Sequence, residues 1–150
     1  MKTILAAAII VAAGFTAPAV APPLCDAKGM GFAGLLAKCN RGETTTLTLA
    51  SGKPLAEGPI TLQSGAYYKF EIEADGSAEL ALAGADFFRA IWINEVVIND
   101  LEVRPIGLDS FEFDDEGTIE LSFIAIKPGS YTLMIPGSKG DSQRVSIAIQ

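Results

Sequence analysis

Three sulfur-bearing side chains, Cys25, Met30 and Cys39, are the residues of this chain whose types most directly suggest chemistry. Thiolates and thioethers are soft ligands of the kind that select Cu(I). The two cysteines can instead form a disulfide, which is the default state of a cysteine pair in an exported protein. Closing this loop of about 15 residues would stabilise the fold by roughly 3 kcal/mol. We expect a Cys25–Cys39 disulfide, and Cu(I) binding or delivery by Cys25, Met30 and Cys39 is the alternative.

A group of carboxylates precedes the clearest strand pattern of the chain. Its members are Asp109, Glu112, Asp114, Asp115 and Glu116. Carboxylate oxygens suit a hard cation such as calcium, but the spacing is not that of an EF-hand loop. Apolar Phe111 and Phe113 alternate with the acidic residues, as a strand requires. The pattern therefore favours a solvated turn over a calcium site.

Histidine is absent from the whole chain. This removes the usual general base, the commonest zinc and copper ligand, and every nucleophile–histidine arrangement. No glycine-rich phosphate loop follows a strand into a helix, so nucleotide binding has no support. A carboxylate pair could still hydrolyse glycosides, with Asp114 or Asp115 as candidates. We expect a protein that is not an enzyme and that carries no cofactor.

Residues 1–19 have the three parts of a secretory signal. Lys2 precedes an apolar run from Ile4 to Ala13, and small residues end the segment at Ala17–Ala19. The residues before Cys25 are not those of a lipoprotein signal, and no later apolar run is long enough to span a bilayer. We predict a cleaved signal peptide, a periplasmic or secreted protein, and no membrane insertion.

The chain has 150 residues and a net charge of −7, with the charges spread along it. Its length after the signal is that of one domain. An acidic surface favours solubility and disfavours nucleic acid as a partner. The remaining partner classes are an exported protein and a small ligand.

Beyond Thr44 the apolar residues alternate as in strands. The strongest signals are Ala66–Glu73, which puts Tyr68, Phe70 and Ile72 on one face, and Thr118–Gly137, whose two arms are joined by a turn at Lys127–Gly129. We predict one hairpin at that turn and another at Asp75-Gly76. Roughly seven to nine short strands with regular turn signals predict an antiparallel β-sandwich over residues 44–150. Residues 20–43 would form a short N-terminal segment closed by the disulfide.

The stretch Ala85–Asp100 is ambiguous because its alternation is blurred by consecutive apolar residues. It contains Trp92, the only tryptophan of the chain. A run that is apolar on both faces is usually a strand covered on both sides, so we expect Trp92 to pack in the core. The alternative is an exposed apolar patch that binds a protein partner.

Three sequence blocks resemble bacterial exported cupredoxin-like domains: GAYYKFEIEADGSAELALAGADFF, TIELSFIAIKPGSYTLMIPG and the final VSIAI. The resemblance covers about residues 44–150. It implies a Greek-key sandwich of two sheets. It also implies that one loop end of the sandwich gathers metal and partner contacts, here near Phe87, Phe88, Trp92, Pro136 and Ser138.

The resemblance does not extend to the copper ligands. A blue-copper site needs two histidines and a cysteine. At the positions where the family places them, this chain has the Glu79-Leu80 region, then Met134 or Ile135, then Ser138. The resemblance therefore implies a binding module that keeps the cupredoxin scaffold without a type 1 copper site.

Overall fold

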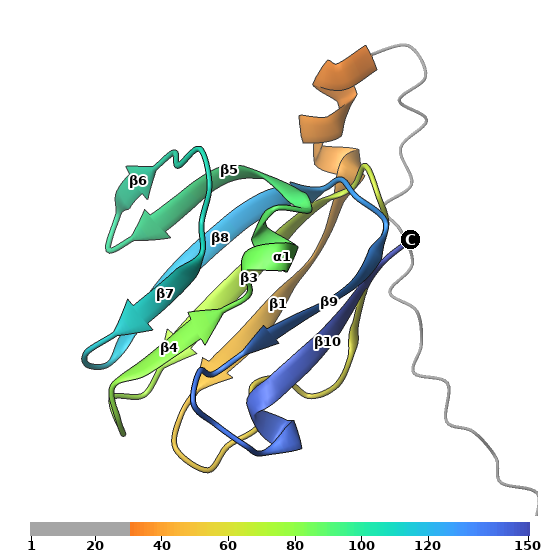
Figure 1. Cartoon of the computed structure of the whole chain (residues 1–150). Coiled ribbons are helices and arrows are strands. Elements are labelled where there is room, and N and C mark those ends of the chain that lie inside the picture. The colour runs from red at the N-terminus through yellow and green to blue at the C-terminus, as the bar shows by residue number, and fades with distance from the viewer. Residues whose placement is uncertain (1–30) are drawn as a thin grey trace, which may run out of the picture.

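A computed structural model describes residues 31–150, apart from the side chains of Phe32 and Ala33. The described chain begins with two short 3-10 helices and continues almost entirely in strands (Figure 1). The elements are η1 (Gly31–Leu36), η2 (Lys38–Asn40), β1 (Arg41–Leu49), β2 (Ile60–Leu62), β3 (Tyr67–Ala74), β4 (Leu80–Ala83), α1 (Ala85–Phe88), β5 (Ile91–Ile98), β6 (Leu101–Val103), β7 (Ser110–Phe113), β8 (Gly117–Ala125), β9 (Gly129–Met134), η3 (Asp141–Gln143) and β10 (Arg144–Ile149).

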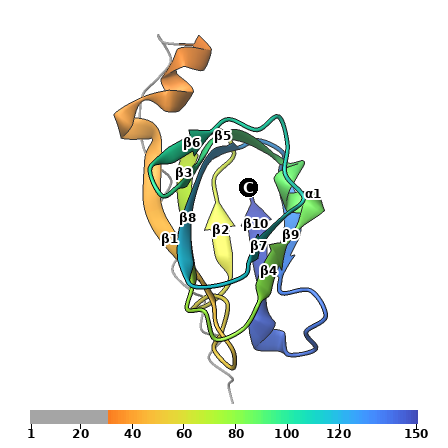
Figure 2. The same cartoon turned by 90° about the vertical axis from the view of Figure 1, so that its left-hand side faces the viewer.

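The strands of residues 31–150 form two five-stranded sheets. The first sheet has the order β1-β3-β8-β5-β6 and the second β2-β10-β9-β4-β7. Figure 2 shows the layers facing each other, with β1, β3 and β8 on one side and β4 and β9 on the other. The prediction of an all-β sandwich is confirmed.

Two strand pairs are parallel, so the prediction of a wholly antiparallel sandwich is wrong. These pairs are β1 with β3 and β10 with β2. Between β1 and β3 the chain crosses to the second sheet and returns, which leaves the two strands pointing the same way. Period-two alternation shows which face of a strand is buried, but it carries no information on strand direction.

The predicted core-facing side of residues 66–73 is confirmed. Tyr68, Phe70 and Ile72 are all buried in one core cluster with side chains of both sheets. The rings of Phe70 and Phe123 meet edge to face, with centroids 4.9 Å apart. An aromatic cluster therefore joins neighbouring strands β3 and β8 at the centre of the sandwich.

Neither predicted hairpin is present. β8 pairs with β3 and β5 in the first sheet, whereas β9 pairs with β10 and β4 in the second. The turn at Lys127–Gly129 therefore carries the chain from one sheet to the other, and Asp75-Gly76 lies in a similar crossing from β3 to β4. Two strands that face each other across a core show the same alternation as two strands of a hairpin, because each has one buried face.

A tight hairpin instead joins β5 to β6. Asn99 and Asp100 both have positive φ, 47° and 67°, and Ile98 pairs with Leu101 across them. Positive φ at both central residues defines a type I′ turn, whose twist matches that of the flanking strands. This hairpin lies in the stretch that the sequence pattern left ambiguous.

Candidate functional site

The sulfur residues divide between the described and the undescribed part of the chain. Cys39 lies in η2 and is not a free cysteine. Cys25 and Met30 lie outside the described residues, as does the predicted signal peptide at residues 1–19. The Cys25–Cys39 disulfide and the Cu(I) alternative therefore both stay predictions.

The positions that the cupredoxin resemblance assigned to copper ligands come to one end of the second sheet. Ala83 of β4 pairs with Met134 of β9 in antiparallel register, so the residues just before β4 lie beside those just after β9. Met134 is exposed and Ile135 is buried. The Ser138 hydroxyl donates to the Ile135 carbonyl oxygen at 2.6 Å. Over residues 31–150 no group of three or more His, Cys, Asp or Glu side chains could hold a metal.

Two members of the predicted partner surface are buried, so that prediction is wrong for them. Phe87 has no exposed surface and Phe88 is only 3% exposed. The Phe87 ring packs against Phe70, Phe123 and Tyr131, at centroid distances of 5.8, 5.6 and 6.3 Å. The single turn of α1 therefore directs both phenylalanines into the core.

The other members of that predicted surface do not lie together. Trp92 is at one end of the sandwich, and Pro136 and Ser138 are at the other. β5 begins where β8 ends, since Ile91 pairs with Ala125. β9 starts just beyond Ala125 and runs six residues away from this end before it reaches Pro136, a distance of about 20 Å. Trp92 is therefore not contiguous with the loop that contains Pro136 and Ser138.

Trp92 is 48% exposed, so the prediction that it packs in the core is wrong. Its neighbours Ile91 and Ile93 belong to the core cluster, which places Trp92 on the outer face of the first sheet. The alternation of these three residues could have indicated that Trp92 faces outward, but the consecutive apolar residues further along the strand obscured it.

Trp92 is the exposed end of an apolar row on that outer face. The ladder places Ile124 between Tyr67 and Trp92. Tyr67 and Ile124 are 6% and 2% exposed, although neither belongs to the core cluster between the sheets. The Arg41 guanidinium lies 4.6 Å from the centroid of the Tyr67 ring. We call Arg41, Tyr67, Ile124 and Trp92 the Trp92 row.

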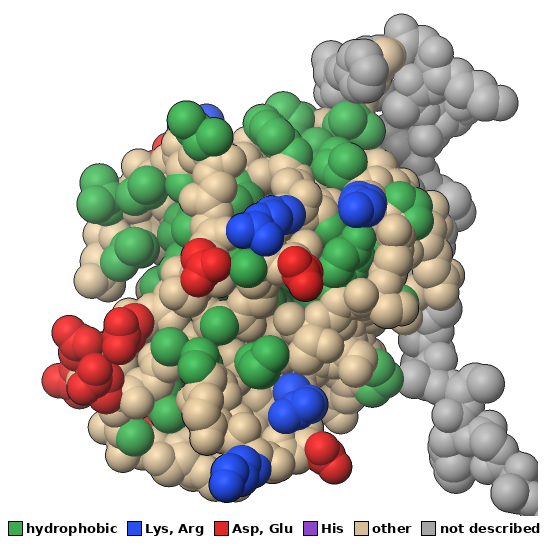
Figure 3. All heavy atoms as spheres, in the orientation of Figure 1, with side chains coloured by type: hydrophobic (Ala, Val, Ile, Leu, Met, Phe, Trp, Pro, Cys, Tyr) green, Lys and Arg blue, Asp and Glu red, His purple; other side chains and the backbone are tan. Residues whose placement is uncertain are grey.

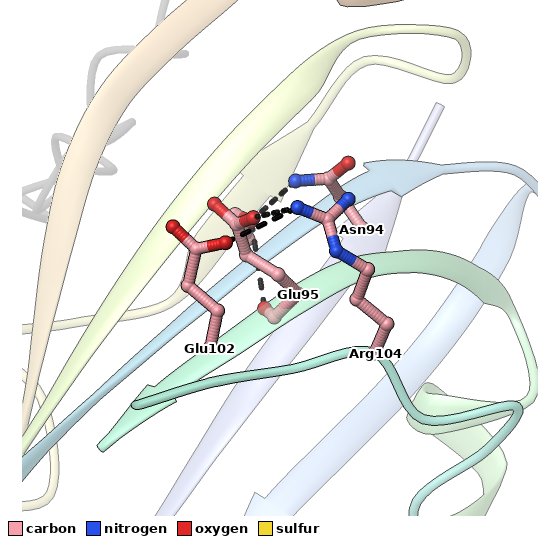
Figure 4. Close-up of polar contacts among 5 residues, drawn as sticks. Asn94, Glu95, Glu102 and Arg104 are labelled. Atoms are coloured by element: carbon pink, nitrogen blue, oxygen red, sulfur yellow. Dashed lines mark hydrogen bonds and ion pairs between the residues drawn. The ribbon is translucent and has the colours of Figure 1, made fainter. Parts of the chain in front are cut away.

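Next to the row, a bulge in β5 builds a polar cluster on the same face (Figure 4). The Asn94 amide donates to the Ser122 hydroxyl at 3.1 Å, and this hydroxyl donates to the Glu95 carbonyl at 3.4 Å. Ser122 is thereby satisfied, which matters because it is the only buried polar side chain among the described residues. The Arg104 guanidinium lies 3.4 Å from Glu95 and 3.2 Å from Glu102.

Apolar side chains are also exposed along the short edge strand β6, where Figure 3 shows a group of hydrophobic atoms. Leu101 is 63% exposed and Val103 39%. Ile98 and Ile106, on either side of β6, are exposed as well. The sequence pattern carries no information on which strand forms an edge.

An open cleft lies between the edge strands β1 and β2. It has a volume of about 650 Å³ and is lined mainly by threonines of β1, the following loop and Ile60. Lys53 on its rim forms an ion pair with Asp75 at 3.1 Å. Hydrogen bonds from Ser77 and Lys53 hold the pKa of the Asp75 carboxyl below its usual value. The volume would admit a small ligand.

Elsewhere, burial raises the pKa of the Tyr68 hydroxyl, although the Gln63 N–H donates to it at 2.7 Å and partly opposes this shift. This shift belongs to a packed core tyrosine. It does not mark an acid–base pair, since no second titratable group causes it.

The acidic stretch forms the turn between β7 and β8. Asp114, Asp115 and Glu116 are exposed there, and Figure 3 shows acidic side chains gathered at this corner. The Asp115 carboxylate accepts a hydrogen bond from the Glu116 N–H at 2.8 Å. The prediction of a solvated turn is confirmed.

No protein-family model and no curated protein matches the chain. Among solved structures it is similar to a multi-copper oxidase from Pseudomonas thermotolerans, with a TM-score of 0.53, 17% identity, and coverage of 72% of this chain and 29% of that one. A laccase-like multi-copper oxidase from Ochrobactrum sp. gives a TM-score of 0.49 and 9% identity, covering 69% and 24%. A blue copper oxidase from Nitrosomonas europaea gives 0.47 and 14%, covering 61% and 30%.

The chain thus spans less than a third of each of these oxidases. Identities this low bear on the fold alone. Within the described residues no helix has the length and apolar character needed to cross a membrane. The chain is an all-β sandwich of two sheets that resembles the cupredoxin domains of multicopper oxidases.

Proposed function

We propose that the chain is an exported, non-enzymatic cupredoxin-like module without a type 1 copper site, and that it acts by binding another exported protein. The observation that carries the proposal is the half-exposed Trp92 beside two buried apolar residues on the outer face of a sheet. Tryptophan is among the residue types most enriched at protein interfaces, which supports a contact made by this exposed side chain.

The composition of the Trp92 row supports a protein contact. Its exposed members, Trp92 and Arg41, belong to two of the residue types most enriched among those that dominate binding energy at protein interfaces. Tyr67 and Ile124 are buried and offer a partner no surface, but they give Trp92 and Arg41 an ordered support before any partner arrives. Stacking of Arg41 on Tyr67 further fixes its position. Prior ordering reduces the entropy lost on binding.

Replacing Trp92 by alanine should weaken partner binding about 30-fold or more, which is the loss of about 2 kcal/mol typical of a central interface residue. The change should spare the fold, because Trp92 lies outside the core cluster. Proteins retained from an exported-protein extract by immobilised wild-type chain would be identified, and the affinity of the purified partner measured by calorimetry.

Met134→Ala is the matched control, since Met134 is 40% exposed and lies at the opposite end of the sandwich. Equal partner binding by wild type and Trp92→Ala would refute the proposed contact. Binding of a small molecule that survives Trp92→Ala but is lost when Thr46→Arg fills the cleft would assign the function to the cleft between β1 and β2 instead.

Addition of Cu(II) to the purified protein should give no stoichiometric complex with a strong visible charge-transfer band, because the chain has no histidine to ligate it. Such a band would disprove the proposal. Thiol titration of the denatured, unreduced protein should find no free thiol. Two free thiols would instead support Cu(I) handling by Cys25, Met30 and Cys39.

A further inference from the structure

Among residues 31–150, no strand pairs with the outer side of β6, which lies at the edge of the first sheet. Ile98 and Leu101 flank the two-residue turn, so the backbone N–H and C=O of Leu101 face β5, and those of Val103 do the same. The backbone groups of Glu102 and Arg104 therefore point away from the sheet. Over residues 31–150 neither of these two amides donates to a backbone carbonyl outside the hairpin.

Pro105 does not block this edge. Pro105 is two residues beyond Val103, so its backbone nitrogen points toward β5, as those of Leu101 and Val103 do. The N–H that proline lacks is therefore missing on the β5 side, not on the outer side. The proline thus ends the ladder between β5 and β6 and leaves the outer side of Glu102 and Arg104 open. An unpaired edge of this kind is a template for pairing with another strand.

The two faces of the edge differ in chemistry. Leu101 and Val103 pair with Ile98 and Val96 on the core-facing side, yet both are substantially exposed. Glu102 and Arg104 lie on the outer face, with side chains 59% and 65% exposed. Figure 4 shows the Arg104 guanidinium on the same side as Glu95 and Glu102.

We propose that β6 pairs in antiparallel register with β6 of a second copy of this chain, about a two-fold axis at Val103. In this register Glu102 of each copy lies opposite Arg104 of the other, so both pairs across the axis have opposite charges. Directly opposite residues with opposite charges stabilise a strand pair. Val103 would meet Val103 of the second copy on the apolar side.

This charge pattern is what identifies the occupant as a second copy. A two-fold axis makes a surface meet itself, so it must be self-complementary. Glu102 comes one residue before the axis and Arg104 one residue after it, so the two-fold axis brings each glutamate opposite an arginine. The outward backbone groups of Glu102 and Arg104 would also exchange hydrogen bonds as closely spaced pairs, which joins the first sheets of the two copies into one.

The contact is small, because β6 has only three residues. We therefore expect a reversible dimer with a Kd of roughly tens to hundreds of micromolar, as is typical of interfaces at the low end of size. Sedimentation equilibrium over about 10 µM to 1 mM would measure it. The contact uses a different surface from the Trp92 row, so Trp92→Ala should leave self-association unchanged.

Charge reversal tests the register directly. Glu102→Arg alone and Arg104→Glu alone each place like charges opposite one another in both pairs, so each variant should associate at least tenfold more weakly. An equimolar mixture should restore the wild-type affinity, because the heterodimer has an arginine opposite a glutamate in both pairs. Loss of the ion pair within a chain cannot explain such recovery, since both proteins in the mixture still lack it.

Glu112→Arg is the matched control, because Glu112 is an exposed glutamate on β7, an edge strand of the second sheet. It should associate like wild type. The proposal fails if wild type stays monomeric at the highest concentration, if the mixture does not recover, or if Glu112→Arg alone abolishes association. Amide exchange adds a test without mutation: the Glu102 and Arg104 amides should exchange more slowly as protein concentration rises, and a concentration-independent rate would overturn the pairing.

Discussion

Replacing Phe87 by alanine should lower the free energy of unfolding by about 3–5 kcal/mol, the range found when a fully buried phenylalanine is truncated. Phe87 has no exposed surface, and its ring contacts Phe70, Phe88, Phe123 and Tyr131. The cavity would open between the two sheets, because Phe70 and Phe123 belong to the first and Tyr131 to the second. The core could collapse only partly, since the strands around it are fixed by their ladders.

Urea denaturation followed by far-UV circular dichroism would measure this loss. Backbone circular dichroism is the better probe, because the only tryptophan, Trp92, is already half exposed in the native protein. Trp92→Ala provides the contrast and should cost much less stability than Phe87→Ala. If Phe87→Ala were as stable as wild type and lost only partner binding, Phe87 would belong to a partner surface and its place in the core would be contradicted.

Replacing Gly84 by alanine should cost about 1–3 kcal/mol through overpacking. A Cβ at this position would overlap the Leu133 Cδ2 methyl and lie 3.1 Å from the Thr132 carbonyl oxygen. The φ of Gly84 is 176°, an extended value that any residue adopts, so the expected cost is steric. Gly84 precedes α1, and its carbonyl accepts the Phe88 N–H at 3.0 Å. A shift of Gly84 would therefore also disturb the turn that directs Phe87 inward.

The same denaturation experiment would measure the effect of Gly84→Ala. Gly107→Ala is the control, because a Cβ there meets no atom within 4 Å, and its stability should change little. Adding Leu133→Val to Gly84→Ala should recover part of the loss if the clash with this methyl is the cause. Equal stabilities of wild type and Gly84→Ala would show that Leu133 of β9 moves aside without lowering the free energy of unfolding, which would contradict the prediction.

The loop end suggested by the cupredoxin resemblance shows why site residues were harder to predict than the fold. Phe87 and Phe88 are adjacent and apolar, and a sequence pattern shows neither that α1 turns both of them inward nor that Trp92 lies at the far end from Pro136. Placing these residues requires knowing which strands are neighbours. The ladders of β5 with β8 and of β4 with β9 supply that knowledge.

The all-β class of the fold was predictable from the sequence alone. Alternation with period two identified the inward face of β3, because burial of one strand face is a local property of the chain. The chain has no histidine, whereas a type 1 copper centre needs two imidazole ligands.

The pairing of the strands was not predictable in this way and follows from the tertiary structure. β8 and β9 have the alternation of a hairpin but lie in opposite sheets, since a strand buried on one face satisfies its pattern equally well beside its neighbour or across the core from it. The same distinction placed Trp92 on an outer face and β6 at a free edge. Both candidate contact surfaces therefore come from the arrangement of the sheets, because an edge and an outer face exist only once the strands have been ordered.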